Sequence, residues 1–328
     1  DGSISFKYAD STDLGYIDSL DFKVNGNKVN WQFLNEQIDI SELHLSKPLK
    51  PGDSIIITTP FRVKIPSGKF SRLGHIGQSY QITQWFAKPA VFDKNGWHPM
   101  SYLDQGEFFS EFGNYDVSIT VPKNYILMAT GDLQNEQELE FLNEKAELTA
   151  QLMEENKLPV RDSFEKKDMS FPKSSLEKKT LRFVQRNVHD FAWFTDKRYH
   201  ILKGEVDINN RKITSWALFT NNEAKLWRRS IEYINDATRY FSKWVGEYPY
   251  NHVTAVDGTI SAGGGMEYPN ITVIGSSGDS KSLETVIVHE VGHNWYYGIL
   301  GSNERDNAWM DEGLNTYIEI RYMEEKYP

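Results

Sequence analysis

Apolar and polar residues alternate in short runs along the first part of the chain, and turn residues separate these runs. In residues 115–121 every second side chain is apolar, which is the period of a strand with one buried face. Glycine, proline and asparagine in Asn25-Gly26-Asn27 and Pro51-Gly52-Asp53 fit tight turns. Further short runs of strand character lie at 54–59, 181–188, 201–208 and 213–219. The pattern predicts antiparallel β structure that persists to about residue 219.

Other stretches repeat apolar residues at the spacing of a helix. Helices are expected at 135–157, 222–246, 282–297 and 308–327. The helix over 135–157 is expected at the surface, and its apolar stripe ends at either Ala150 or Met153. Asn222 is expected to cap the second helix and Gly246 to end it. The chain therefore combines a β-rich first part with a more helical second part.

Composition limits the classes of protein that the chain can represent. Its 328 residues are 39% hydrophobic and 25% charged, which is typical of a folded protein long enough for two domains. With 36 Lys and Arg against 46 Asp and Glu, the net charge of -10 disfavours binding to nucleic acid or anionic lipid. The longest apolar run, near 285–288, is far shorter than the roughly 20 residues of a membrane-spanning helix. Because cysteine is absent, His and carboxylates are the only strong metal ligands available.

The most informative segment is Val288-His289-Glu290-Val291-Gly292-His293, an HExxH pattern inside a predicted helix. His289 and His293 are four residues apart, so both imidazoles project from one helix face and can share one metal ion. Glu290 lies about 100° round the helix from His289, where it can reach a metal-bound water as a general base. Gly292 costs about 1 kcal/mol relative to alanine, so we expect another backbone or a metal-bound ligand to approach it closely.

A catalytic zinc site takes three protein ligands, so a third ligand is needed. Glu312, 19 positions after His293, is the candidate, since an antiparallel helix pair would bring it back over the first helix. Asp311 can either orient a zinc-bound imidazole or interact with a helix dipole. The remaining histidines lack ligand spacing and are expected at surface or core positions: His44, His75, His98, His189, His200 and His252.

A second motif, Gly263-Gly264-Gly265-Met266-Glu267-Tyr268, has its glutamate 22 residues before His289 and lies between expected strands at 252–256 and 271–274. Glycines allow a backbone to run beside an extended substrate, which can then pair with it like an added strand. Glu267 would meet the end of that substrate, where a carboxylate favours a free α-ammonium group. The motif therefore favours an exopeptidase, although a simple glycine loop is the alternative.

Together, the G-x-M-E pattern and HExxH-x18-E resemble the aminopeptidase N family of gluzincin zinc peptidases, which also contains the leukotriene hydrolases. The resemblance extends to Thr83-Gln84-Trp85, to residues 111–122 and to residues 188–193. It implies an α+β protein: an N-terminal, saddle-like antiparallel β domain over 1–200, with a helical insertion near 135–157, and then the first part of a thermolysin-like catalytic domain over 201–328.

The resemblance also implies the role of each motif residue. By this resemblance one Zn²⁺ per chain is bound by His289, His293 and Glu312, and Glu290 activates the water. Glu267 holds the amino terminus of the substrate. The other residues expected to bind substrate are Gly264, Gly265, Met266 and Gln84.

The chain departs from the family pattern at three places. Phe86 stands where many members carry a second Gln or Glu for the amine, and Tyr268 replaces the usual Asn. The tyrosine that stabilises the oxyanion in the family, and the helical C-terminal domain, would lie beyond Pro328. We therefore expect a piece of a longer enzyme that is poorly active by itself, because an oxyanion donor is worth about 10² to 10³ in rate.

The sequence thus predicts a zinc aminopeptidase that removes N-terminal residues from peptides by attack of a zinc-activated water, with Glu290 as general base. One alternative is an endopeptidase of thermolysin type, and another is a non-catalytic peptide-binding module. By family analogy alone, epoxide hydrolysis is a further activity to assay. The branch that the chain resembles is often exported, which favours the bacterial periplasm or envelope over the cytoplasm.

Overall fold

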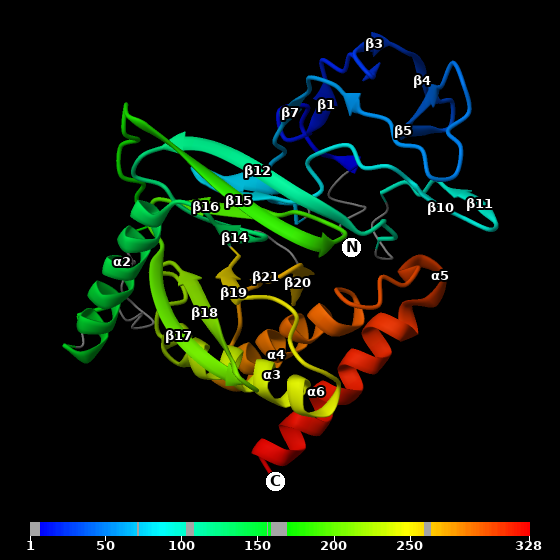
Figure 1. The fold of residues 1–328 in the computed structure, drawn as a ribbon. Helices are drawn as coiled ribbons and strands as arrows, with labels where there is room; N and C mark the ends of the chain where they lie inside the picture. The colour runs from blue at the N-terminus through cyan, green and yellow to red at the C-terminus, as the bar shows by residue number, and fades with distance from the viewer. Residues whose placement is uncertain (1–6, 71, 103–107, 156, 159–168, 259–263) are drawn as a thin grey trace.

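The computed structural model describes residues 7–70, 72–102, 108–155, 157–158, 169–258 and 264–328. It is a mixed α+β structure with several antiparallel sheets, so the broad fold class is confirmed. In Figure 1 the small N-terminal strands lie at the top, two long strands cross the middle, and helices α3, α4 and α6 gather at the bottom. None of the helices in these described ranges is long and apolar enough to cross a membrane.

The N-terminal strands form four small sheets. The sheets are β1 (Tyr16–Asp18) with β7 (Arg62–Lys64), β2 (Lys23–Val24) with β3 (Asn27–Lys28) and β6 (Ile57–Thr58), β4 (Asn30–Leu34) with β5 (Gln37–His44), and β10 (Val91–Asp93) with β11 (Gly96–His98). The predicted turn at Asn25-Gly26 joins β2 to β3, with positive φ at both residues. The strand expected over 54–59 is reduced to the two residues of β6, because its partner β2 is equally short.

Two larger antiparallel sheets follow. They are β12 (Gly113–Pro122), β15 (Lys178–Val188) and β14 (Asp132–Leu133), and then β13 (Ile126–Ala129), β16 (Trp193–Asp196), β9 (Ser79–Ile82) and β8 (Gly74–Ile76). In β12, Ile119 and Val121 are buried while Ser118 and Thr120 are exposed, as the alternation predicts. Antiparallel pairing of Ile119 with Leu181 joins the two long strands into a single curved layer (Figure 1).

A five-stranded mixed sheet lies beneath the helix that carries the HExxH motif. Its order is β17 (His200–Ile208), β18 (Arg211–Phe219), β19 (His252–Asp257), β21 (Ile271–Ile274) and β20 (Gly265–Tyr268). Strands β18, β19 and β21 are parallel, whereas β17 and β20 are antiparallel to their neighbours. The sequence interpretation left residues 265–268 in the glycine-rich loop, but the backbone pairs with β21 and forms an edge strand. Gly263 lies outside the described residues.

The helices are α2 (Glu136–Glu154), the 3₁₀ turn η1 (Trp227–Arg229), α3 (Ser230–Trp244), α4 (Ser280–Tyr296), α5 (Glu304–Ala308), the π-helical turn η2 (Trp309–Gly313) and α6 (Leu314–Lys326). In α2, Met153 packs against the core and Ala150 is exposed, which decides between the two predicted ends of the stripe. Asn222 does not cap α3, because residues 221–226 form turns before the helix starts. The helix expected over 308–327 begins with the π-helical turn η2 and continues as α6, and the non-helical backbone at Asn307 lies just before it, within α5.

The five-stranded sheet is buried on both faces. On one face, Ala217 and Ala255 pack beneath α3 and α4 in a cluster that includes Phe241 and Trp295. On the other face the sheet packs against α2 and strands of the neighbouring sheet. This second cluster contains Leu218, Val256 and Val273 from the five-stranded sheet, with Leu142, Ala146, Ile126, Met128 and Phe194 opposite them. Burial on both faces fixes the sheet relative to α4, the helix that carries the HExxH motif.

Candidate metal centre

Helix α4 presents both histidines of the motif to the turn η2. Asp279 caps this helix by accepting hydrogen bonds from the backbone N–H groups of Lys281 and Ser282. One turn separates His289 and His293, and their Nε2 atoms lie 3.1 Å apart. The helix therefore directs two imidazole nitrogens to a single point.

Glu312 completes a three-residue donor set. Its Oε2 atom lies 3.2 Å from Nε2 of His289 and 3.8 Å from Nε2 of His293. Three ligand atoms at such separations surround a point about 2 Å from each of them, and zinc takes histidine nitrogen and carboxylate oxygen at about 2.0–2.2 Å. Two nitrogens and one carboxylate form the donor set of a catalytic zinc site. The residues present therefore fit zinc.

Carboxylates hold the outer nitrogen of each imidazole. Nδ1 of His293 donates to Oδ1 of Asp311 over 2.5 Å, in fully buried surroundings. Nδ1 of His289 donates to Oε2 of Glu319 over 2.9 Å. Such partners fix the tautomer and the ring orientation of metal-binding histidines. Sequence reasoning included Asp311 but missed Glu319, although its place seven residues after Glu312, two turns along the helix, was a usable signal.

Protons occupy the donor nitrogens when no metal is bound. Burial lowers the pKa of His289, but hydrogen bonds with Glu312 and Glu319 outweigh it and raise the value to about 9. Burial also lowers the pKa of His293, but the nearby charges of Glu267 and Asp311 outweigh this effect and raise the pKa well above its ordinary value. The hydrogen bond with His289 lowers the pKa of Glu312. A metal ion must displace these imidazole protons, so its affinity depends on pH.

Glu290 lies beside this donor set without belonging to it. Its side chain is buried, and its Oε2 atom has no hydrogen-bond partner among the described residues. Burial raises its pKa to about 7, against the opposing charges of His293 and His289. A Cβ atom at Gly265 would lie 2.6 Å from its Oε1 atom, so only glycine lets β20 run so close to this carboxylate. A Cβ atom at Gly264, in contrast, would meet Cγ2 of Val286 at an ordinary contact distance of 4.0 Å.

Glu267 is brought to the same place from β20. One potential ligand atom each of Glu267, Glu290 and His293 lies within 4.8 Å of the others, and all three side chains are buried. Glu267 also forms a second buried group of carboxylates with Asp311 and Glu304, again within 4.8 Å. Glu304, in the short helix α5, was not predicted. The structure thus places a strongly acidic region directly beside the histidines.

The reason for Gly292 differs from the expectation. A Cβ atom there would lie 2.1 Å from Oδ1 of Asn315 and 2.4 Å from the ring of Phe241. The close neighbours are therefore side chains of α6 and α3, and the expectation of another backbone or a metal-bound ligand was wrong. Asn315 in addition donates a hydrogen bond to the backbone oxygen of His289 over 2.7 Å. Glycine is needed here because α3, α4 and α6 meet at the turn of α4 that carries the two histidines.

Residues of the N-terminal β region reach β20 from its other face. The amide of Gln84 donates to the Tyr268 hydroxyl over 3.0 Å, and Gln84 adopts a positive φ of 44°, which is uncommon outside glycine. Arg72 touches the sulfur of Met266, with Nη1 and Sδ 2.5 Å apart. The motif strand is therefore in contact with the histidine-bearing helix on one face and with the β region on the other. Sequence reasoning missed Arg72, which carries no motif.

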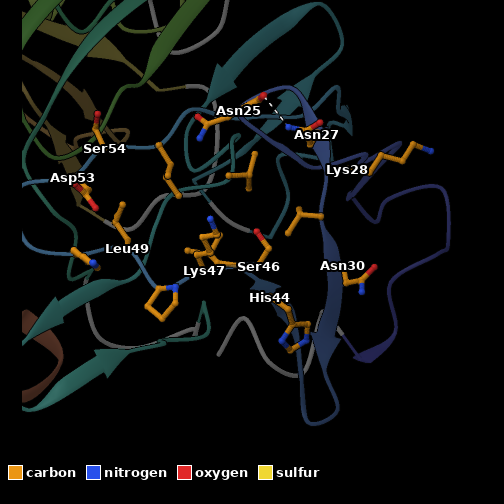
Figure 2. Close-up of a pocket in the computed structure, with 16 residues that line it drawn as sticks. Asn25, Asn27, Lys28, Asn30, His44, Ser46, Lys47, Leu49, Asp53 and Ser54 are labelled. Carbon is orange, nitrogen blue, oxygen red and sulfur yellow. Dashed lines mark hydrogen bonds between the residues drawn. The ribbon is translucent and has the colours of Figure 1, made fainter.

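Within the described ranges, the groups of potential metal ligands include only His289 and His293 among the histidines. A large pocket of about 890 Å³ lies instead among the N-terminal strands, lined by residues such as Asn25, His44, Lys47 and Asp53 (Figure 2). No predicted site residue lines it. This pocket is therefore separate from the candidate metal centre.

The fold and the donor set agree with comparisons to known proteins. Residues 229–328 match the model of the peptidase family M1 domain. Leukotriene A-4 hydrolase of Xenopus laevis is 38% identical over 61 residues, and leucine aminopeptidase 2-1 of Meyerozyma guilliermondii is 36% identical over 63 residues. Each alignment covers 18% of this chain and 10% of the relative.

Solved structures share the fold over nearly the whole chain. The M1 zinc metallopeptidase of Deinococcus radiodurans is similar with a TM-score of 0.57 at 17% identity, over 95% of this chain and 61% of that one. Aminopeptidase A of Legionella pneumophila, in complex with aspartic acid, is similar with a TM-score of 0.60 at 13% identity, over 97% of this chain and 34% of that one. The chain thus spans less than two thirds of these proteins.

The donor set suits zinc, and the fold is the one found in solved M1 zinc metallopeptidases. The match of residues 229–328 to the model of the peptidase family M1 domain supports the resemblance found in the sequence. The chemical roles of the individual side chains stay predictions.

Proposed function

We propose that this chain holds the metal centre and the amino-terminal binding site of a zinc aminopeptidase that acts on peptides. The observation that supports this most is the juxtaposition of two sites. The three-residue donor set and the buried carboxylate of Glu267 come from different elements, α4 with η2 and β20, yet they share one region around His293. A hydrolytic centre beside an anionic anchor fits cleavage next to a free amino terminus.

His289, His293 and Glu312 would hold one zinc ion per chain. Bound zinc would act as a Lewis acid toward the scissile carbonyl and would lower the pKa of water. Glu290 accepts the proton of the attacking water and passes it to the leaving amine. A pKa of about 7 suits a group that must both take and give a proton near neutral pH. Its contact with Gly265 holds its carboxylate beside the edge strand.

Strand β20 provides the place for the substrate. It is the edge of the five-stranded sheet, so one side of its backbone has no partner strand among the described residues. An extended peptide can pair with such an edge, and backbone hydrogen bonds then align it whatever its side chains. Glu267, directed toward α4, would bind the α-ammonium group of the first residue, so that cleavage would remove one residue from the amino terminus. In this proposal the β region over 1–200 is the saddle-like domain, and 201–328 begin the thermolysin-like domain.

Three measurements test the proposal on the full-length protein. Elemental mass spectrometry should find about one zinc per chain, and the variant His289→Ala should lose it. Glu290→Gln should keep zinc while turnover falls by about 10² to 10⁴, the usual contribution of a general base. Normal turnover by this variant would remove Glu290 from the mechanism, and absence of zinc from the unaltered protein would favour a peptide-binding module.

The amine anchor is tested separately. Glu267→Gln keeps the size of the side chain and removes its charge, so hydrolysis of peptides with a free amino terminus should fall while zinc content stays the same. An acetylated peptide of the same sequence should be a poor substrate of the unaltered enzyme. If acetylated and free peptides are cleaved equally well, the protein is an endopeptidase and Glu267 has no role as an anchor.

A further inference from the structure

Helix α6 runs antiparallel to α4 and contacts it through a line of polar side chains. Four residues spaced by four, three and four positions share one face of α6: Asn315, Glu319, Tyr322 and Lys326. The first two bind His289, over 2.7 Å to its backbone oxygen and 2.9 Å to its Nδ1 atom. The last two bind Glu284, the fifth residue of α4. One face of α6 therefore contacts α4 both at the metal centre and about two turns away from it.

Glu284 is a buried carboxylate surrounded by three donors. Its Oε1 atom accepts a hydrogen bond from the Tyr322 hydroxyl over 2.5 Å and lies 2.7 Å from Nζ of Lys326. Its Oε2 atom accepts a hydrogen bond from the Tyr327 hydroxyl, also over 2.5 Å. All three donors belong to the end of α6 or to the residue that follows it. Such partners are what make a fully buried carboxylate tolerable in the interior of a protein.

The positive charge of Lys326 is retained over the ordinary pH range. Burial lowers its pKa, but hydrogen bonds with Asp236 and Glu284 outweigh burial and raise the pKa above its ordinary value. Two carboxylates of α3 also lie near Lys326, and each has an arginine partner: Asp236 with Arg239 over 2.7 Å, and Glu232 with Arg229 over 2.6 Å. Among the residues that the structure describes, Lys326 is the only cation paired with Glu284.

This buried ion pair is compatible with only one register of α6 on α4. Apolar contacts, such as those of Ile318 in the core cluster, are non-directional and resist sliding of a helix only weakly. A shift of α6 by one turn, about 5.4 Å, would instead leave Glu284 buried without its cation. Buried polar groups fix the register of packed helices in the same way in coiled coils. The pair therefore also fixes Glu319, two turns back along the same helix.

We propose that Glu284 is a positioning residue of the metal centre: paired with Lys326, it fixes α6 so that Glu319 holds the His289 imidazole in the orientation that binds zinc. This inference rests on the proposed function, because it takes His289 to be a zinc ligand. Glu284 lies five residues before His289 and outside the three-residue donor set. Its effect on the metal therefore passes through α6.

The test is a double-mutant cycle on zinc affinity, measured on the full-length protein with zinc chloride and a competing chelator. Glu284→Gln keeps the size of the side chain and removes its charge. It should weaken zinc binding by about 10-fold, and by no more than Glu319→Gln does, because it acts through that residue. In the Glu319→Gln background the same change should alter the affinity by less than about 2-fold, since the contact that it positions is already lost.

Two further variants separate positioning from general stability. Glu138 is another buried glutamate in an ion pair, 2.5 Å from Nζ of Lys179, but this pair joins α2 to β15. Glu138→Gln should therefore lower the stability of the fold and leave zinc affinity unchanged. Tyr322→Phe removes one hydrogen bond to Glu284 and keeps the ion pair. It should weaken zinc binding by about 3-fold, again only when Glu319 is present, and it provides the measurement if Glu284→Gln does not fold.

Three results would overturn the inference. They are unaltered zinc affinity of a folded Glu284→Gln protein, a loss of equal size in the Glu319→Gln background, and an equal loss in Glu138→Gln. Peptide hydrolysis does not enter the cycle, so the proposed function is tested independently. A protein that shows the coupling between Glu284 and Glu319 but cleaves no free-amine peptide would contradict the function and keep the inference. Absence of zinc binding by the unaltered protein would contradict both.

Discussion

A methyl group at Gly265 should disable the proposed general base without touching the metal ligands. In Gly265→Ala the new Cβ atom would lie 2.6 Å from Oε1 of Glu290 and 2.7 Å from its Cδ and Cγ atoms. These separations are roughly 1 Å shorter than ordinary contacts, so the carboxylate must move by about that distance. Backbone strain does not add to the effect, since Gly265 is an ordinary strand residue with no positive φ.

The expected loss follows from the geometry. A displacement of about 1 Å in a reacting group can cost about 10²-fold in rate. We therefore expect kcat of the full-length Gly265→Ala enzyme to fall by about two orders of magnitude on a free-amine peptide amide. Zinc content should be unchanged, because the three atoms nearest to the added methyl group all belong to Glu290. Steady-state kinetics and elemental analysis of the same preparation measure both quantities.

A matched variant excludes a general effect of the substitution. At Gly278, just before α4, an added Cβ atom meets nothing within 4 Å and φ is not positive, so Gly278→Ala should retain the unaltered rate. If Gly265→Ala has the same kcat as Gly278→Ala, the contact with Glu290 does not position the carboxylate. Loss of zinc from Gly265→Ala would equally refute the reasoning, since the damage would then lie in the metal site.

Two further predictions concern the second carboxylate of the metal centre and acid stability. Glu319→Gln should weaken zinc binding by about 10-fold to 100-fold in a chelator competition, because Glu319 orients His289, whereas the exposed Glu324→Gln on the same helix should not. Burial lowers the pKa of His189 to about 4, so the folded state resists protonation of this side chain while the unfolded state accepts it below about pH 6.5. The free energy of unfolding should therefore fall as the pH drops from 6.5 to 4, by about 3 kcal/mol from this group. Denaturant unfolding of His189→Gln should show a shallower dependence over that range than the exposed control His44→Gln, and equal slopes would contradict the assignment.

Local patterns determined much of the fold. The two-residue period of residues 115–121 predicted β12, and the helical spacing before and within the HExxH motif predicted α4, because both signals depend only on neighbours along the chain. The residues at which helices begin and end were less predictable. The start of α3 and the division of the last helix depend on turns and a π-helical segment whose backbone is fixed by packing.

The contacts of two glycines could also not be predicted from the sequence. Gly265 and Gly292 both stood out in the sequence, and each position proves to be crowded by side chains from elsewhere in the chain. The sequence could mark them as positions where a side chain would not fit. It could not name Glu290 for the first or Asn315 and Phe241 for the second, because those contacts depend on how helices and strands pack together.

The sequence by itself predicted the donor set, because the spacing of His289, His293 and Glu312 along one helix and a following turn can be read directly from the chain. Only the tertiary structure brought Glu319 to His289 and Arg72 to Met266, across 30 and 194 positions of sequence. Pairs at such separations meet only when the sheets and helices have packed, and the energy of that packing is distributed over many apolar contacts. The predicted metal ligands can therefore be recognised from a short motif, whereas the residues that orient these ligands are brought to them only by the fold.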